Sequence, residues 1–334
     1  MGIIMDNPLK SLISQLTPLN YPIGDCTGKT VVITGASSGL GLEAARHFVR
    51  LNAGKVILGC RDLKRGERAK ATIVSSEGDP KAEVIEVWQI DLESFDSVKC
   101  FCQRAAGLDQ LDILVENAGI QTADFALSEG RERQITINVI STFLIAFLLL
   151  PTLERSSAVT RELPRLVIVA SNAHKAVSLN QDIGEPVFDS FQAPGFMGLR
   201  YAYSKLLVVL IGRELAMRIN ARDGGPRVVL NMVDTGLCKT NLFRDARFPL
   251  SWFLSTMLWL LGRSSEMGSR CLVAAALAGP EAHGKYLEDC RISKESRFVC
   301  STKGAQMQKR VFDELLEILH DIEPGLPGRI QQLC

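Results

Sequence analysis

A tyrosine and a lysine spaced four residues apart could carry proton transfer in this chain. Tyr201 and Lys205 stand in the run YAYSK at the start of a segment predicted to be helical, 201–218, so both fall on one helical face. A phenol has a pKa of about 10, and a neighbouring ammonium stabilises the phenolate and lowers that pKa. The spacing therefore predicts that Tyr201 gives and takes a proton near neutral pH. Tyr203 lies two residues from Lys205 and is predicted to point elsewhere.

A glycine-rich turn near the start of the chain could hold phosphate. The segment TGASSGLG at 34–41 lies between an apolar β-branched run, 29–34, and a helical pattern, 40–52. Glycines let the backbone approach a pyrophosphate, and a helix N-terminus offers free N–H groups. The spacing G-x-x-x-G-x-G differs from the commonest Rossmann fingerprint, G-x-G-x-x-G. A tight loop without a ligand is the alternative, but the place between strand and helix favours a dinucleotide site.

The residue after the second predicted strand indicates which dinucleotide binds. In a dinucleotide fold this position faces the adenosine ribose, where an acid binds the 2′-hydroxyl of NAD and an arginine matches the 2′-phosphate of NADP. Arg61 therefore predicts NADP(H). Asp62 adjoins it and would reverse the preference if it were the ribose contact. A solvated charge run, RDLKRGER, is the third interpretation.

The elements that must position these residues alternate between strand and helix. Strands are predicted at 29–34, 55–60, 83–90, 111–115, 166–170 and 228–233, and helices at 40–52, from about 63, at 94–106 with Ser94 as cap, at 131–150 ending at Pro151, at 201–218 and at 306–322. This alternation predicts an α/β fold class: a single-domain Rossmann fold, with a doubly wound, mostly parallel sheet and helices on both faces. Ligands in such folds bind at the carboxyl ends of the strands.

Three segments lie outside the alternating pattern. We predict an N-terminal arm over 1–27 and one domain over 28–334, which contains an insertion, 172–200, and an apolar segment, 241–264. Long loops in compact domains are usually functional, so both segments are predicted to wall a substrate pocket. Trp252, Phe253 and Trp259 in the second segment indicate a hydrophobic small-molecule substrate. A core or dimer helix and shallow membrane contact are the alternatives for 241–264.

Composition argues against nucleic-acid-binding, zinc-binding and membrane-spanning classes of protein. The 334 residues carry 38 basic and 37 acidic side chains, so nothing indicates a nucleic-acid partner. None of the four histidines pairs with cysteine at zinc-ligand spacing, which predicts no metal site. The nine scattered cysteines predict reduced thiols and a cytoplasmic location, with Cys100 and Cys102 either a redox pair or two helix positions. No apolar run reaches the roughly 18 residues of a membrane span, and no signal peptide is predicted.

The motifs together resemble the short-chain dehydrogenase/reductase superfamily over about residues 28–290. In chain order they are TGASSGLG at 34–41, Asp91-Leu92 after the third strand, Asn117-Ala118-Gly119 after the fourth, Asn138 on the next helix, Ser171 after the fifth strand and Y-x-x-x-K at 201–205. Within it, ILGCRDLKRGE, VASNAH and GKYLEDC resemble the retinol-dehydrogenase-like branch. The ENAG form at 116–119 and the tail VFDELLEILHDIEPG resemble fungal natural-product ketoreductases.

This resemblance implies catalytic roles. Tyr201 would protonate the substrate carbonyl oxygen as hydride arrives, and accept the proton in reverse. Lys205 would lower the pKa of Tyr201, and Ser171 would hydrogen-bond the substrate oxygen. Asn138 would hold a water that relays protons. Structural alternatives are a strand-end cap for Ser171 and a helix-pinning amide for Asn138, while His174 is an alternative base.

The resemblance also implies contacts to the cofactor. Asp91 would meet the adenine, and Thr240 would reach the nicotinamide amide. The implied cofactor-binding set is Gly35, Ser37, Ser38, Gly39, Leu40, Gly41, Arg61, Asp91, Leu92, Asn117, Ala118, Gly119, Tyr201, Lys205, Gly236, Leu237 and Thr240. Two positions depart from the family pattern: Glu116 replaces an asparagine, and Thr235 replaces a proline in the turn that covers the nicotinamide.

The resulting expectation is an NADP(H)-dependent reductase of a ketone or aldehyde on a hydrophobic small molecule, in natural-product biosynthesis. An alcohol dehydrogenase working in the oxidising direction is the close alternative. A cofactor-binding scaffold or sensor without turnover is the alternative of a different class, and the intact set Asn138, Ser171, Tyr201 and Lys205 argues against it. A homo-oligomer and peripheral membrane contact stay open.

Overall fold

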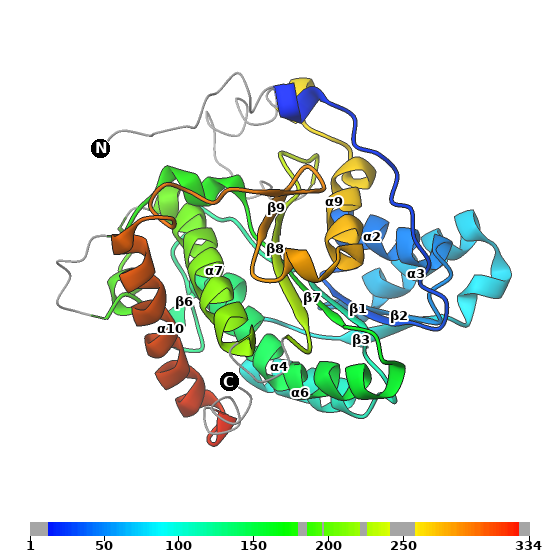
Figure 1. Cartoon of the computed structure of the whole chain (residues 1–334), viewed down its shortest axis with the longest axis horizontal. Coiled ribbons are helices and arrows are strands. Elements are labelled where there is room, and N and C mark those ends of the chain that lie inside the picture. Colours follow the sequence, from blue (N-terminus) through cyan, green and yellow to red (C-terminus); the bar gives the residue numbers. More distant parts are fainter. Residues whose placement is uncertain (1–12, 180–185, 196, 221–225, 241–257, 327–334) are drawn as a thin grey trace.

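An eight-stranded sheet forms the centre of the computed structural model (Figure 1), in the order β10-β9-β8-β7-β4-β1-β2-β3. The structure describes residues 13–179, 186–195, 197–220, 226–240 and 258–326. The strands of this sheet are β1 Thr30–Thr34, β2 Lys55–Cys60, β3 Ile85–Gln89, β4 Ile113–Glu116, β7 Arg165–Val169, β8 Val229–Asp234, β9 Tyr286–Glu288 and β10 Arg291–Ser293. All neighbours pair in parallel except β9 and β10. The predicted fold class is confirmed.

Helices cover both faces of the sheet (Figure 1). They are α2 Gly39–Arg50, α3 Leu63–Glu77, α4 Phe95–Ala106, α5 Arg133–Ile135, α6 Thr142–Thr160, α7 Met197–Asn220, α9 Ser265–Leu277 and α10 Thr302–Ile322, and β5 Leu127–Ser128 pairs with β6 Arg131–Glu132 in a small hairpin. Side chains of a strand alternate between faces. Val31 and Ile33 accordingly join the core under α2 and α9, whereas Val32 joins the core under α6 and α7.

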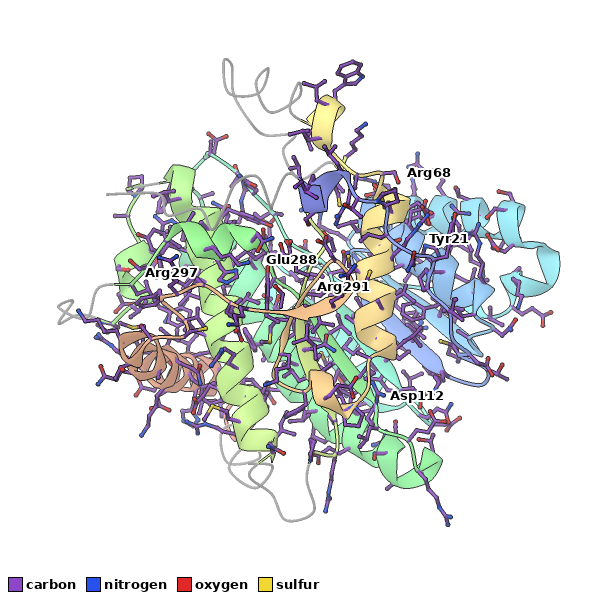
Figure 2. The ribbon with its side chains drawn as sticks, turned by 45° about the horizontal axis from the view of Figure 1, so that its top comes forward. Tyr21, Arg68, Asp112, Glu288, Arg291 and Arg297 are labelled. Carbon is purple, nitrogen blue, oxygen red and sulfur yellow. The ribbon has the colours of Figure 1, made fainter. Side chains whose placement is uncertain are left out.

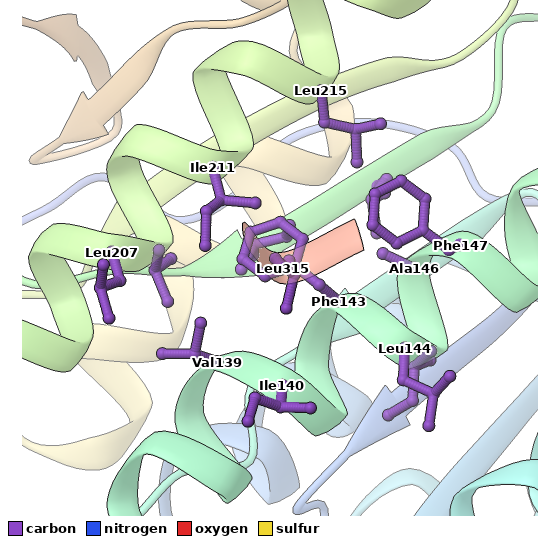
Figure 3. Close-up of a cluster of buried hydrophobic side chains, with 14 of the residues drawn as sticks. Val139, Ile140, Phe143, Leu144, Ala146, Phe147, Leu207, Ile211, Leu215 and Leu315 are labelled. Atoms are coloured by element: carbon purple, nitrogen blue, oxygen red, sulfur yellow. The ribbon is translucent and has the colours of Figure 1, made fainter. Parts of the chain in front are cut away.

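The larger of these two cores lies between α6, α7 and α10 (Figure 3). Phe147 packs edge-on against Phe312 of α10 at a centroid distance of 6.0 Å. The helical stretch Arg133–Thr160 is long and apolar enough to cross a membrane, but 89% of its apolar window is buried inside the protein. It is therefore a core helix, and its apolar run serves the packing of the sheet.

Helix α6 continues through Pro151, so the predicted end of a helix at that residue is wrong. A proline inside a helix removes a hydrogen bond and costs about 3 kcal/mol. Pro151 is exposed, while Leu149, Leu150 and Leu153 around it are fully buried. Each buried leucine contributes roughly 1.5–3 kcal/mol, so the packing outweighs the lost bond. The helical stretch begins at Arg133, two residues after the predicted start at about residue 131, because Arg131 and Glu132 belong to β6.

The described part of the N-terminal arm packs on the domain. Leu19 and Cys26 are buried in the core under α2 and α9. The guanidinium of Arg270 on α9 lies 3.8 Å from the ring centroid of Tyr21, and Figure 2 shows that ring beside α9. His47 of α2 meets the same ring edge-on. The arm is thus fastened to the outer face of two helices.

The predicted insertion, 172–200, contributes to the core in its described parts. Val187, Phe188 and Phe191 are buried against α7 and α10, and the Arg200 side chain donates to the carbonyl oxygens of Phe191, Ala193 and Gly195. Helix α7 begins at Met197, before the predicted start at Tyr201. Residues 180–185 and 241–257, which include most of the predicted apolar segment, lie outside the described residues. Of its remainder, Trp259 is 74% exposed.

The cysteines do not form a redox pair at 100 and 102. Cys100 is exposed and Cys102 is buried on α4, as two positions of an amphipathic helix require. The eight cysteines within the described ranges are all free thiols. In the same ranges, no group of three or more His, Cys, Asp or Glu side chains could hold a metal ion.

Candidate active site

A cavity of about 900 Å³ opens at the carboxyl ends of β1, β4, β7 and β8. The fold reverses its strand order between β1 and β4, which is where doubly wound sheets bind ligands. The predicted site residues that line the cavity are Gly35, Ser37, Ser38, Gly39, Leu40, Arg61, Asp91, Leu92, Asn117, Ala118, Gly119, Ser171, Tyr201, Lys205, Gly236, Leu237 and Thr240. Gly41 and Asn138 do not line it.

The turn between β1 and α2 has the geometry of a phosphate cradle. Gly35 and Gly39 have φ values of +69° and +60°, which other residues rarely adopt. The N-cap residue of α2, Ser38, makes no capping hydrogen bond through its side chain, so it leaves the first N–H groups of the helix free of a side-chain cap. By contrast, side chains cap α3, α4, α9 and α10. An uncapped helix N-terminus facing a cavity is suited to an anion.

Two residues support this turn from behind. A Cβ on Gly41 would lie 2.6 Å from the Gly35 carbonyl oxygen, so Gly41 contributes by close packing and does not contact the cavity. Asn117 donates through Nδ2 to the carbonyl oxygens of Thr34, at 2.9 Å, and Gly35, at 3.3 Å. The Thr34 hydroxyl in turn accepts from the backbone N–H groups of Asn117 and Ala118. The loop after β4 therefore fixes the shape of the cradle.

The contacts at one end of the cavity distinguish the two candidates for the ribose contact, Arg61 and Asp62. The Asp62 side chain accepts from the Arg65 backbone N–H at 3.1 Å, and so caps α3. Arg61 is 59% exposed, and its Nη1 donates to Glu93 Oε1 at 3.1 Å. Arg65 lines the same end, one helical turn further on, and the sequence reasoning missed it. Arg61 and Arg65 thus both line this end of the cavity, whereas the Asp62 carboxylate caps α3.

Ser171, Tyr201 and Lys205 converge at the opposite end. The Ser171 hydroxyl is a hydrogen-bond partner of the Tyr201 phenol and also accepts from Ala173 N at 3.2 Å, so it serves as the predicted cap as well. Lys205 Nζ lies 5.7 Å from the centre of the Tyr201 ring and donates to the Val169 carbonyl oxygen at 2.7 Å. The i, i+4 spacing thus brings both side chains to one place, as predicted.

The electrostatics of the pair differ from the prediction. Burial raises the pKa of Tyr201 well above its usual value, with the Ser171 hydrogen bond acting in the lowering direction and Asp234 in the raising direction. Burial lowers the pKa of Lys205 to about 8, and Asp234 opposes that shift. The net direction for Tyr201 in the protein by itself is therefore opposite to the predicted lowering. A neutral phenol is a proton donor.

Asn138 lies in a π-helical turn, Thr136–Ser141, that leads into α6. Its amide accepts from Ile120 N at 2.8 Å and donates to Ile120 O at 2.9 Å, and it also donates to Ser204 Oγ at 3.0 Å. The side chain therefore pins the loop after β4 to α7, which is the structural alternative noted above. Single π-helical turns occur frequently at functional sites.

The two competing residues are occupied elsewhere. His174 is fully buried, with Nδ1 against Ser171 O at 2.7 Å and Nε2 accepting from Ser296 N at 3.1 Å. Burial lowers its pKa to about 4, so it stays neutral and supports the Ser171 backbone. The Tyr203 ring packs against Phe191, away from the cavity.

The N-terminal arm contributes a cavity residue that sequence reasoning missed. Gln15 Nε2 donates to the carbonyl oxygens of Leu237, at 2.6 Å, and Leu261, at 2.9 Å, and Gln15 Oε1 accepts from Leu237 N at 3.0 Å. Ser14 contacts Asp289, which pairs with Arg263 at 2.7 Å. The arm thereby closes one side of the cavity. No local pattern signals a contact across more than 200 residues.

Glu116, the first departure from the family pattern, is a buried carboxyl at the end of β4. It is 3% exposed, and neither carboxyl oxygen has a hydrogen-bond partner. Burial raises its pKa well above the usual value, because no donor offsets the loss of water. Glu116 does not line the cavity. The departure therefore bears on stability.

We expect Glu116→Gln to stabilise the protein increasingly as pH rises. Between the unfolded and folded pKa values of Glu116 the native state holds a proton that the unfolded state releases, so wild-type stability falls by up to about 1.4 kcal/mol per pH unit. Glutamine removes that dependence. Denaturant unfolding at pH 5 and pH 8 measures it, and a constant difference between the proteins at both pH values contradicts the prediction.

Comparison with known proteins gives a consistent family. A family model described as short chain dehydrogenase matches residues 29–181. The short chain dehydrogenase/reductase dmxR8 of Cryptosporiopsis sp. is 41% identical over 325 residues, covering 94% of this chain and 98% of that protein. The short chain dehydrogenase atnD of Emericella nidulans is 41% identical over 295 residues, covering 85% of this chain and 93% of that protein.

Solved structures agree at the level of the fold. A crystal structure of an uncharacterized protein from Mycobacterium paratuberculosis is 27% identical with a TM-score of 0.62, covering 89% of this chain and 96% of that chain. The RhlG/NADP active-site complex of Pseudomonas aeruginosa is 22% identical with a TM-score of 0.58, covering 79% of this chain and 95% of that chain.

Proposed function

This chain belongs to the short-chain dehydrogenase/reductase family, and from that premise we propose that it is an NADP(H)-dependent reductase of a ketone or aldehyde. The observation that carries the proposal is one cavity with candidate catalytic residues at one end and candidate cofactor-binding residues at the other. One end holds Ser171, Tyr201 and Lys205, and the other leads past the glycine turn to Arg61 and Arg65. A proton donor and a phosphate cradle in one cavity are what a nicotinamide-dependent carbonyl reduction requires.

The residues present fit a nicotinamide dinucleotide. The uncapped N-terminus of α2 would hold the pyrophosphate. A side chain at Gly35 would clash with the loop after β4, since a Cβ would lie 2.9 Å from Ala118 Cα, so only glycine leaves the turn in the shape that admits a phosphate. Arg61 and Arg65 would hold a 2′-phosphate, since Asp62 is engaged in capping. When bound, the cofactor supplies the hydride.

The chain's own residues would supply the proton and hold the substrate oxygen. Tyr201 holds its hydroxyl proton at neutral pH, as a phenol with a pKa of about 10 or above does, and donates that proton to the substrate oxygen. Ser171 hydrogen-bonds the same oxygen and stabilises the charge that develops on it. Lys205 places a positive charge beside the Tyr201 ring and stabilises the phenolate left behind. A neutral phenol is the form of Tyr201 that reduction requires at its start.

The substrate end of the cavity supports a hydrophobic small molecule. Its apolar lining near Ser171 and Gly236 includes Ile120, Ala173, Leu237 and Leu261. Relatives 41% identical come from fungi, and together with the ketoreductase-like motifs this supports a role in natural-product biosynthesis. Turnover of NADPH with a panel of aromatic and polycyclic ketones tests the proposal. Absence of turnover across the panel, with NADPH bound, would favour a cofactor-binding scaffold.

We expect Gln15→Ala to raise the KM for the carbonyl substrate about three- to tenfold with a smaller effect on kcat. The Gln15 amide holds the cavity wall beside Leu237 through three hydrogen bonds, and a tenfold rise in KM corresponds to about 1.4 kcal/mol, the net contribution of about one of them. Steady-state kinetics measure the split. Thr17→Ala is the matched control, because Thr17 lies on the arm outside the cavity. Equal effects of the two substitutions would contradict a cavity role for Gln15.

A further inference from the structure

Asp234, at the carboxyl end of β8, connects the two loops that flank the candidate catalytic group. It is 4% exposed. Its Oδ1 accepts from Asn172 N at 3.1 Å, and its Oδ2 accepts from Asn172 Nδ2 at 2.9 Å and from Gly236 N at 3.2 Å. Asn172 follows Ser171, and Gly236 lies in the turn where Thr235 replaces the family's proline. The Asp234 carboxylate thus connects the loop after Ser171 to the turn at Gly236. That turn has threonine at position 235 and so lacks the rigidity that a proline would give it.

A second carboxylate, Glu288, lies beside Asp234 on the neighbouring strand. The two residues are register partners in the β8–β9 pair, and Figure 2 shows Glu288 between α7 and α9. Glu288 accepts from Asn172 Nδ2 at 2.5 Å and pairs with Lys175 Nζ at 3.4 Å. The Tyr286 hydroxyl donates to Asn172 Oδ1 at 3.1 Å. Asn172 is therefore held from three sides.

The charge of Asp234 faces titratable groups on every element packed around it. On α7 these are Tyr201 and Lys205, whose pKa values it raises. The remaining ones are Lys175 on the loop after β7, Glu288 and Tyr286 on β9, Cys238 after β8 and Cys271 on α9. Burial, with Glu288 adding to the effect, raises the pKa of Asp234 itself to about 6. Above that pH it is an anion, and its charge raises the pKa of Tyr201.

We propose that Asp234 is a positioning residue of this site, which locks the Ser171 loop to the Gly236 turn through its hydrogen bonds to Asn172 and Gly236. The inference rests on the proposed function, because it assigns Asp234 a part in the same proton transfer. It adds a reason for the pH range of that transfer: the anion opposes formation of the phenolate, so Tyr201 keeps its proton to a higher pH.

Asp234→Asn separates these contributions from ordinary stability. The amide nitrogen cannot accept the bonds that the carboxylate oxygen accepts, and the charge is lost. We expect kcat to fall about tenfold with NADPH affinity changed less than twofold. We expect the alkaline limb of reduction and the acidic limb of alcohol oxidation both to move to lower pH, because the charge that raises the pKa values of Tyr201 and Lys205 is lost. Asp234→Glu, which keeps the charge but moves it, should restore the pH limbs while leaving kcat low.

Asp112→Asn is the matched control. Asp112 is also a buried aspartate, 7% exposed, that accepts from a backbone N–H, that of Thr30, and Figure 2 shows it far from Glu288. It should lower thermal stability without moving either pH limb. If Asp234→Asn leaves both limbs in place and loses activity only in proportion to stability, Asp234 is structural and the proposal is wrong.

Hydrogen exchange of the peptides that contain 171–177 and 234–240 tests the lock without any turnover. We expect both peptides to exchange at least fivefold faster in Asp234→Asn and at the wild-type rate in Asp112→Asn. Unchanged exchange overturns the lock. If the wild type binds NADPH but turns over no carbonyl, the proposed function fails, and the exchange result still decides whether Asp234 joins the two loops.

Discussion

Tyr201→Phe is expected to lower kcat for carbonyl reduction by a factor of about 10²–10⁴ while NADPH binds within twofold of the wild-type affinity. Phenylalanine keeps the ring that lines the cavity and removes only the hydroxyl that Ser171 contacts. Without that proton donor, charge developing on the substrate oxygen can be met only by Ser171 and solvent. Stopped-flow or steady-state oxidation of NADPH measures the loss, and fluorescence titration measures binding.

Tyr203→Phe is the matched control for this substitution. It removes the same hydroxyl two residues away on α7, where the ring packs against Phe191 outside the cavity. The control should retain turnover within about threefold. If Tyr201→Phe also retains turnover, the proton comes from another group and the assignment of Tyr201 fails. A loss of both turnover and NADPH binding would instead mean that the substitution disturbs the cavity.

Much of the fold could be predicted from the sequence, because the central strands are buried on both faces and several of them are short apolar runs. The run TVVIT after Lys29 and the run LVIV before Ala170 became β1 and β7 within a residue of their predicted ends. Motifs that follow such strands come together for a geometric reason, since parallel strands end at one edge. This explains why Gly35, Asn117 and Ser171 meet in one cavity.

The incorrect and missed predictions have a different origin, in burial and in hydrogen bonds that the local sequence pattern does not determine. Pro151 stops a helix in isolation, but the burial of its neighbours keeps α6 intact. Asp62 could bind a ribose or cap a helix, and only the hydrogen bond to Arg65 N decides between them. Gln15 and Asp234 were missed because their partners, Leu237 and Asn172, are set by tertiary packing. The direction of the Tyr201 pKa also depends on burial and on Asp234, neither of which the spacing to Lys205 encodes.

The preference for NADPH over NADH is expected to be at least tenfold in the dissociation constant, and Arg61→Ala with Arg65→Ala should abolish it. Each charge-assisted hydrogen bond to a phosphate contributes roughly 1.5–3 kcal/mol, and about 1.4 kcal/mol is tenfold, so the double substitution should weaken NADPH binding by at least tenfold, the factor by which the wild type prefers it. NADH lacks the 2′-phosphate, and its affinity should change less than threefold. Fluorescence titration of both dinucleotides against wild type and variant measures the ratio.

Two further substitutions separate this ribose contact from the surrounding charge run. Arg68→Ala removes an equivalent positive charge from α3 at an exposed position outside the cavity, and it should leave the ratio unchanged. Asp62→Ala should cost about 1 kcal/mol of stability through the lost cap and likewise leave the ratio unchanged. If the wild type binds NADH as tightly as NADPH, or if Asp62→Ala alone shifts the ratio, the 2′-phosphate is not what these arginines hold. The acid at 62 would then be the ribose contact, and the oxidising direction would gain support.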